Sequence, residues 1–240
     1  MHNRHYLQMA ADAASIKKGD TVLEIGPGEG VLTQVLLEQG AKVVALEKDS
    51  RLIELLREKF KEEEFEVLEG DALEYEPKFK KYTLVGNIPY YITGALFKKF
   101  LSGKAQPHTL VFLIQKEVAE RIARSKKESI LSLSIKAYGS PKYIKTVPAG
   151  AFVPPPKVDS AILLVSDVSR KNFASAAHEE RFFELLRAGF GQKRKLLASN
   201  LKKLLGPDYA SVLQKTGIDL RARAEDVPLE AWLQLASIAA

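Results

Sequence analysis

Cysteine is missing from this chain of 240 residues, which rules out disulfide bonds, zinc–thiolate sites and cysteine nucleophiles. Histidine is scarce, and no two of the four histidines are four positions apart, as ligands on one helix face would be. We therefore expect no metal centre. No apolar run approaches the roughly 18 residues of a membrane-spanning helix, and the first residues have no signal-peptide core. We expect a cytoplasmic protein without membrane contact.

Basic residues outnumber acidic ones, giving a formal net charge of +6 and a pI near 9.3. This balance suits a polyanionic partner such as a nucleic acid. The basic residues gather in several segments, above all in "GQKRKLLASNLKK", residues 191–203. A solvated helix face is the alternative explanation for any single cluster.

Strand and helix patterns alternate through the first two thirds of the chain. A first helix is expected over 5–18, and later helices over 31–40, 50–62 (with Ser50 as N-cap), 94–102 and 116–124. Strands are expected over 21–25, 42–49, 65–73, 82–88 and 108–115, then in a β-rich tail over 129–139, 143–152 and 160–168. Such alternation predicts an α/β fold with a doubly wound, mostly parallel sheet. The last two strands are expected to form an antiparallel edge.

The character of the sequence changes between residues 167 and 177. Beyond that point no segment has a convincing strand pattern, and Gly or Pro punctuates a series of short helices. These helices are expected over 179–191, 193–206, 209–217 and 229–239. We therefore predict two domains, an α/β domain over 1–168 and a small all-helical domain over 177–240. The single Trp232 is interpreted as a core residue of the second domain.

A glycine turn follows the first expected strand, in "VLEIGPGEG". Gly26, Gly28 and Gly30 allow a sharp turn and a close approach of the backbone to a ligand. Glu47 ends the second strand about 20 residues later, where an acid can accept both hydroxyls of a ribose. Asp71 ends the third strand and can accept from an adenine amino group. Tight turns with capping acids are the structural alternative.

The charges around this turn discriminate between two cofactor classes. A dinucleotide fingerprint reads G-x-G-x-x-G and places a pyrophosphate at the helix N-terminus. Here the spacing is G-x-G-x-G, and the carboxylate of Glu29 lies where phosphates would bind. Glu24 adds a second carboxylate, which suits a cationic ligand. S-adenosylmethionine carries an ammonium and a sulfonium and no phosphate, so it is the favoured cofactor.

The fourth strand ends in "VGNIPYYI", an amide followed by a fixed proline corner and two phenols that we expect to be exposed. An exocyclic adenine amine is a poor nucleophile, and two acceptors can hold its N–H bonds while nitrogen becomes pyramidal. The side-chain oxygen of Asn87 supplies one acceptor, and the carbonyl of Ile88, restricted by Pro89, supplies the other. Tyr90 offers a face for an extruded base. Alternatively, the amide caps a turn and the phenol packs in a core.

Several segments together resemble the ribosomal RNA adenine N6-dimethyltransferases, within them the small-subunit type. They include "EIGPGEG", "EGDAL", "GNIPYYI", "AFVPPPKVDSA", "GFGQKRKLLASNL" and "DLRARAEDVPLEAW". The resemblance implies a class I methyltransferase (Rossmann-like) fold with a helical RNA-binding domain. It also implies transfer of methyl groups from S-adenosylmethionine to N6 of two adjacent adenosines near the 3′ end of small-subunit (16S) rRNA. The expected partner is this rRNA or the pre-30S particle, met by a monomer during ribosome biogenesis.

The resemblance also assigns roles to residues. Phe152 precedes a run of prolines, so its ring is expected to be held out on a stiff loop, facing the base opposite the tyrosine. An ordinary buried phenylalanine is the alternative. The residues expected to be catalytic are Asn87, Ile88, Pro89, Tyr90 and Phe152. The residues expected to bind the cofactor are Glu24, Gly26, Gly28, Glu47, Lys48, Asp71, Ala72 and Asn87.

Other functions remain open at this stage. A large-subunit rRNA adenine N6-methyltransferase shares the glycine turn and the Asn-x-Pro-Tyr motif. A largely non-catalytic RNA-binding assembly or transcription factor on the same fold is a second alternative, and a nicotinamide dehydrogenase a third. Family members usually carry a basic segment about 25 residues before the glycine turn, and "MHNRHYLQ" does not contain it. We therefore expect weaker cofactor affinity and impaired turnover in this chain.

Overall fold

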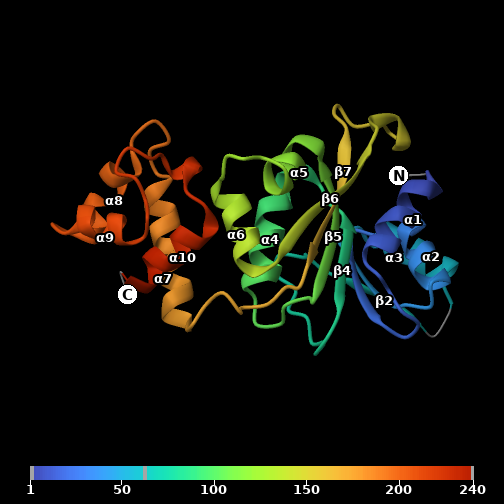
Figure 1. Cartoon of the computed structure of the whole chain (residues 1–240). Coiled ribbons are helices and arrows are strands. Elements are labelled where there is room, and N and C mark those ends of the chain that lie inside the picture. The colour runs from blue at the N-terminus through green and yellow to red at the C-terminus, as the bar shows by residue number, and fades with distance from the viewer. Residues whose placement is uncertain (1–2, 62–63, 239–240) are drawn as a thin grey trace. The chain divides into compact units, whose positions relative to one another are not determined.

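The computed structural model describes residues 3–61 and 64–238 (Figure 1). The chain divides into two compact units. One, the α/β unit, comprises Met1–Glu120 and Gly139–Val168, and the other, the helical unit, comprises Arg121–Tyr138 and Ser169–Ala240. The predicted boundary at residue 168 therefore misplaces one segment, since residues 121–138 belong to the unit that contains the C-terminal helices.

A seven-stranded sheet with the order β3-β2-β1-β4-β5-β7-β6 forms the centre of the α/β unit. Its strands are β1 (Thr21–Ile25), β2 (Lys42–Glu47), β3 (Phe65–Glu69), β4 (Thr83–Asn87), β5 (Thr109–Gln115), β6 (Ser140–Val147) and β7 (Ser160–Ser166). The first five strands pair in parallel, and β7 runs antiparallel to both β5 and β6. The expected antiparallel edge is thus confirmed.

Helices cover both faces of this sheet. They are α1 (Arg4–Ala13), α2 (Val31–Glu38), α3 (Ser50–Lys59), α4 (Thr93–Ser102) and α5 (Lys116–Ala123), the last of which ends in the helical unit. Figure 1 shows α1, α2 and α3 on one face and α4 on the other. Because both faces are covered, the central strands are mostly apolar, and the middle five residues of β5 are all buried.

The helical unit consists of α6 (Ile130–Tyr138), α7 (Ala176–Gly189), α8 (Leu197–Leu205), α9 (Tyr209–Lys215) and α10 (Leu229–Ile238). No strand occurs among its described residues. The sequence predicted this for the part beyond residue 177, whereas a strand was expected over 129–139. Trp232 is fully buried in its core and stacks on Phe190, which confirms its interpretation as a core residue. No helix within residues 3–61 and 64–238 is both long and apolar enough to cross a membrane.

The largest error in the predicted elements concerns α6, which was expected to be a strand. "ILSLSIKAY" alternates apolar residues with serine, the period of a strand, and this pattern misled the assignment. In the structure, the Ser134 hydroxyl bonds back to the carbonyl of Ile130 one helical turn earlier, 2.6 Å away. Leu133 and Ala137, four positions apart, are both buried in the core of the helical unit. Tertiary burial therefore selects the helix.

Helix starts differ in two further places. The N-cap of α3 is Asp49 rather than Ser50, since the Asp49 carboxylate accepts the N–H of Arg51 at 3.0 Å. The basic run that opens the predicted helix over 193–206 lies in a turn, and α8 begins only at Leu197. The ends predicted for α3, at residue 62, and for α10, at residue 239, lie outside the described residues.

Candidate active site

The glycine turn joins β1 to α2 at the carboxyl edge of the sheet. Gly26, Gly28 and Gly30 have φ angles of +65°, +60° and +75°, a region that costs other residues roughly 1–2 kcal/mol. A Cβ at Gly30 would in addition lie 2.4 Å from the ring of Phe60. The turn is held by the N–H of Gly26, which donates to the carbonyl of Leu46 in β2 at 3.0 Å. The backbone of the turn is therefore held in one position at the carboxyl end of β1.

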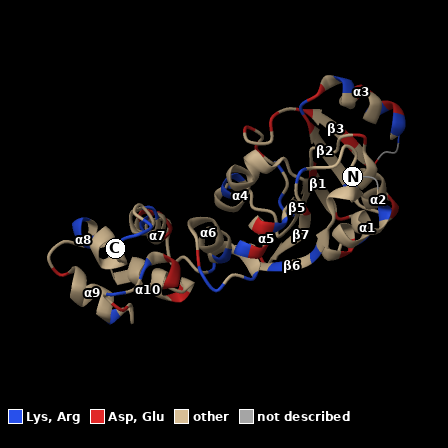
Figure 2. Cartoon of the chain, turned by 90° about the horizontal axis from the view of Figure 1, so that it is seen from above, with Lys and Arg blue, Asp and Glu red and all other residues tan. Residues whose placement is uncertain are grey.

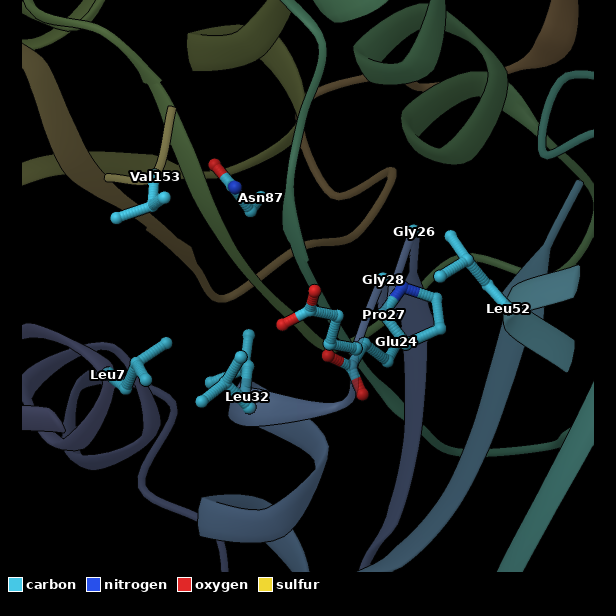
Figure 3. A pocket seen from close by; sticks show the side chains of 11 residues that line it. Leu7, Glu24, Gly26, Pro27, Gly28, Leu32, Leu52, Asn87 and Val153 are labelled. Carbon is cyan, nitrogen blue, oxygen red and sulfur yellow. The ribbon is translucent and has the colours of Figure 1, made fainter. Parts of the chain in front are cut away.

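A cavity of about 300 Å³ opens above this turn. Its lining residues come from α1, β1, the glycine turn, α2, α3, the end of β4 and the loop after β6: Leu7, Glu24, Gly26, Pro27, Gly28, Glu29, Val31, Leu32, Leu52, Asn87 and Val153. Figure 3 shows Leu7 and Leu32 on one side and Asn87 and Val153 on another. The two strands involved, β1 and β4, are neighbours where the strand order reverses, the usual ligand site of such sheets.

Glu24 contributes a buried carboxylate to this cavity, with 1% of the residue exposed. Burial raises its pKa from the ordinary value of 4.5 to about 7, and the nearby Glu47 acts in the same direction. The hydroxyl of Thr33 in α2 donates to this carboxylate at 2.6 Å and offsets part of the effect. A cation in the cavity would therefore stabilise the charged form of Glu24.

The predicted ribose and adenine contacts lie at the ends of β2 and β3 and do not line this cavity. The Glu47 carboxylate accepts the N–H of Gly28 at 3.2 Å, so it is attached to the glycine turn, and also the N–H of Lys48 at 2.8 Å. Asp71 pairs with the Lys48 ammonium at 3.0 Å. The Leu73 N–H and Lys48 together lower the pKa of Asp71. Its neighbour Ala72 is buried.

A second cavity of about 240 Å³ lies at the proline corner. It is lined by Asn87, Ile88, Pro89, Tyr90, Phe152, Pro154 and Pro156. Asn87 lines both cavities, and its exposed side chain makes no hydrogen bond to any other residue that the structure describes. The Ile88 side chain is buried and its N–H donates to the Leu113 carbonyl at 3.1 Å. The corner predicted from the sequence is thus open and adjoins the cavity above the glycine turn.

The two aromatic residues are held more tightly than the sequence suggested. Tyr90 is only half-buried rather than exposed, and its hydroxyl lies 3.0 Å from the Ser160 hydroxyl. Phe152 is 8% exposed and packs in the core between the sheet and α1–α2, so it does not stand out on its loop. Of the two neighbouring tyrosines, Tyr90 and Tyr91, it is Tyr91 that is exposed, with 88% of the residue accessible to solvent. Ser160 was not predicted from the sequence, where its place inside "AFVPPPKVDSA" was the one available signal.

Known proteins similar to this chain point to one family. A family model described as Ribosomal RNA adenine dimethylase matches residues 1–240. The Ribosomal RNA small subunit methyltransferase A of Dehalococcoides mccartyi is 43% identical over 233 residues, covering 93% of this chain and 80% of that protein. The protein of the same name from Trichormus variabilis is 39% identical over 251 aligned positions, covering 97% and 92%.

Solved structures agree with this family. A dimethyladenosine transferase from Plasmodium falciparum has a TM-score of 0.86 and 29% identity, and the match covers 98% of this chain and 95% of that one. The 23S rRNA methyltransferase ErmE has a TM-score of 0.83 and 28% identity, covering 99% and 98%. The expected class I methyltransferase fold is confirmed. With its whole length matched, the chain belongs to the ribosomal RNA adenine dimethylase family.

Proposed function

We propose that this protein transfers methyl groups from S-adenosylmethionine to N6 of two adjacent adenosines near the 3′ end of small-subunit rRNA. The observation that carries the proposal is the position of Asn87, whose side chain belongs to both cavities. One cavity has the glycine turn and a buried carboxylate, and the other has two aromatic rings. The side chain of Asn87 can therefore contact a methyl donor bound in the first cavity and a flat acceptor base bound in the second at the same time.

The residues of the larger cavity fit the proposed donor. The buried carboxylate of Glu24 is costly without a cation, and the donor carries two positive groups and no phosphate. On this proposal the turn at Gly26 and Gly28 lies along the donor, Glu47 faces its ribose, and Asp71 exchanges Lys48 for its adenine amino group. When bound, the donor supplies a methyl group activated by its sulfonium.

The chain's own residues would hold the acceptor nitrogen in line. The Asn87 side-chain oxygen and the Ile88 carbonyl each accept one N–H of the adenine amine, which frees its lone pair for attack. Tyr90 stacks on the base, an interaction worth roughly 1–3 kcal/mol. No side chain has to remove a proton before the attack, because the amine loses it afterwards. Most of the acceleration would come from positioning.

Charge supports an RNA partner for the helical unit. This unit carries seventeen Lys and Arg against nine Asp and Glu, whereas the α/β unit carries nineteen against twenty-one. Lys193, Arg194 and Lys195 are all exposed in the turn before α8. We propose that they contact RNA phosphates, that the substrate is the pre-30S particle, and that a monomer binds it. Ribosome assembly would place the protein in the cytoplasm.

A large-subunit substrate is the second candidate, favoured by the likeness to the 23S rRNA methyltransferase ErmE. The small-subunit proposal is supported by relatives of 38–43% identity that bear the small-subunit name. Incubation of purified 30S and 50S particles with labelled methyl donor, followed by mass spectrometry of the rRNA, separates the two. Dimethyladenosine in the small-subunit rRNA alone is expected.

Asn87→Ala tests the mechanism. We expect a loss of roughly 100-fold or more in kcat, the usual cost of removing one oriented hydrogen-bonding group from a transition state. Because the side chain is exposed and free of hydrogen bonds to described residues, the thermal transition should not move. Methyl incorporation that this variant leaves unchanged would contradict the role proposed for Asn87 in the transfer.

A further inference from the structure

The start of β7 lies at the catalytic edge of the sheet because β7 is antiparallel to β5. Its first residue, Ser160, pairs with Gln115, the last residue of β5. Asn87, the last residue of β4, pairs with Leu113 of the same strand. If β7 were parallel to β5, its last residues would lie at this edge. Because β7 is antiparallel, its first residues lie beside the proline corner instead.

Ser160 is connected directly to the aromatic wall formed by Tyr90. The hydroxyl oxygens of the two residues are 3.0 Å apart, and Ser160 is 2% exposed. The tyrosine ring lines the smaller cavity while its far end is attached to β7. Ser160 itself is not among the residues that line either cavity. Its hydroxyl therefore restricts the tilt of the ring without access to a bound base.

Asp159, the preceding residue, supports the segment that carries Phe152, the second aromatic residue that lines the smaller cavity. Its carboxylate accepts the N–H of Ala149 at 3.0 Å, and its own carbonyl accepts the N–H of Lys116 at 3.0 Å. Ala149 begins the single 3₁₀ turn Ala149–Ala151, and its carbonyl accepts the N–H of Phe152 at 3.2 Å. The carboxylate thus fixes the turn from which the Phe152 ring enters the cavity wall.

We propose that Asp159 and Ser160 are positioning residues that align the two aromatic walls, Phe152 and Tyr90, around the target adenine. The inference rests on the proposed methyl transfer. A flat base is held for in-line attack only if both walls have a defined spacing, and small misplacements of reacting groups are costly in rate. Neither residue touches the donor cavity, so their effect falls on the acceptor.

Tyr90→Phe and Ser160→Ala, alone and combined, test the hydroxyl pair. Each single change removes one partner and keeps the ring, so we expect kcat/KM for 30S particles to fall about five- to ten-fold. The double variant should fall no further, because both changes remove the same interaction. Affinity for S-adenosylmethionine, measured by calorimetric titration, should stay within two-fold of the parent. Tyr91→Phe, which removes an exposed hydroxyl next in the chain, is the matched control and should be silent.

Asp159 is tested by a graded pair of substitutions. Asp159→Asn keeps an acceptor oxygen for the Ala149 N–H and should retain activity, whereas Asp159→Ala should lose about ten-fold in kcat/KM. Additive losses in the Tyr90 and Ser160 double variant, or full activity in each single variant, would overturn the positioning role. A parent protein that methylates neither particle would instead overturn the proposed function. If Ser160→Ala does not fold, Tyr90→Phe still tests the hydroxyl pair, because phenylalanine keeps the aromatic ring and removes only the hydroxyl.

Discussion

Glu24 has an environment that disfavours its charge. It is buried in the floor of the larger cavity, and a single side-chain bond from Thr33 accompanies it. With a pKa of about 7, the carboxyl is half-protonated near neutral pH. A buried carboxyl of this kind lowers the free energy of unfolding, and strongly shifted pKa values are typical of residues in ligand-binding sites. We interpret it as the acid that receives a cationic donor.

Glu24→Gln should change stability in a pH-dependent way. Well below pH 4.5 the carboxyl is protonated in both the folded and the unfolded state, and parent and variant should be alike. As pH rises toward 7 the unfolded chain releases its proton first, so the free energy of unfolding of the parent falls, by roughly 3 kcal/mol at most. The glutamine avoids this loss while keeping an acceptor for Thr33. Urea unfolding at pH 4.5, 6 and 8 should show the advantage of the variant growing with pH, and a constant difference would contradict it.

The contact between α7 and α10 depends on a glycine inside the helical unit. Gly189 ends α7, and a Cβ there would lie 2.4 Å from the indole of Trp232 in α10. The following Phe190 stacks on the same indole, with 5.9 Å between ring centroids. Absence of a side chain therefore allows the two helices to approach closely.

Gly189→Ala should destabilise the protein although alanine is the better helix former. The gain in helix propensity is at most about 1 kcal/mol, whereas overpacking a core typically costs about 1–3 kcal/mol. We expect a net loss of roughly 1–2 kcal/mol in the free energy of unfolding. Gly94→Ala in α4 is the matched control, since a Cβ there meets nothing within 4 Å. It should be neutral or stabilising, and equal effects of both changes would argue against the close packing.

Positive charge is concentrated in the helical unit, although the net charge of the whole chain is only +6. Figure 2 shows Lys and Arg on α6 and α8 and around the loops of that unit. The α/β unit has a slight excess of acid, so it would repel RNA at a distance. Long-range attraction to the substrate is therefore expected to come from the helical unit.

Replacement of Lys193, Arg194 and Lys195 by alanine should weaken RNA binding in a salt-dependent manner. Each lost phosphate contact lowers the slope of log K against log salt by about 0.7–0.9, so a change of roughly 2–3 is expected. The slope is measured by filter binding of an rRNA fragment at a series of salt concentrations from low to high.

A control of equal charge replaces Lys78, Lys80 and Lys81 of the α/β unit, which are also exposed. It makes the same change in net charge and should leave the slope within one unit of the parent value. If both triple variants lose the same slope, the charge of the whole chain rather than the turn before α8 attracts the RNA.

Short-range patterns in the sequence determined much of this protein. The apolar run of β5 and the mostly apolar segments of β1 and β4 predict buried strands, and the glycines that follow β1 predict the turn because few other residues adopt positive φ. The Asn87 corner was recognisable because a residue before proline is restricted by its neighbour alone. In each of these cases, the residues that determine the local structure lie within a few positions of the structure that they determine.

Only the tertiary structure decided the features that depend on distant partners. The pattern of "ILSLSIKAY" permits strand and helix alike, and burial of Leu133 against the C-terminal helices selects one. The bond between Tyr90 and Ser160 joins residues 70 positions apart, and it exists because β7 is reversed beside β5. Local pattern carries no information on such pairs, since the free energy that forms them comes from packing of the completed sheet.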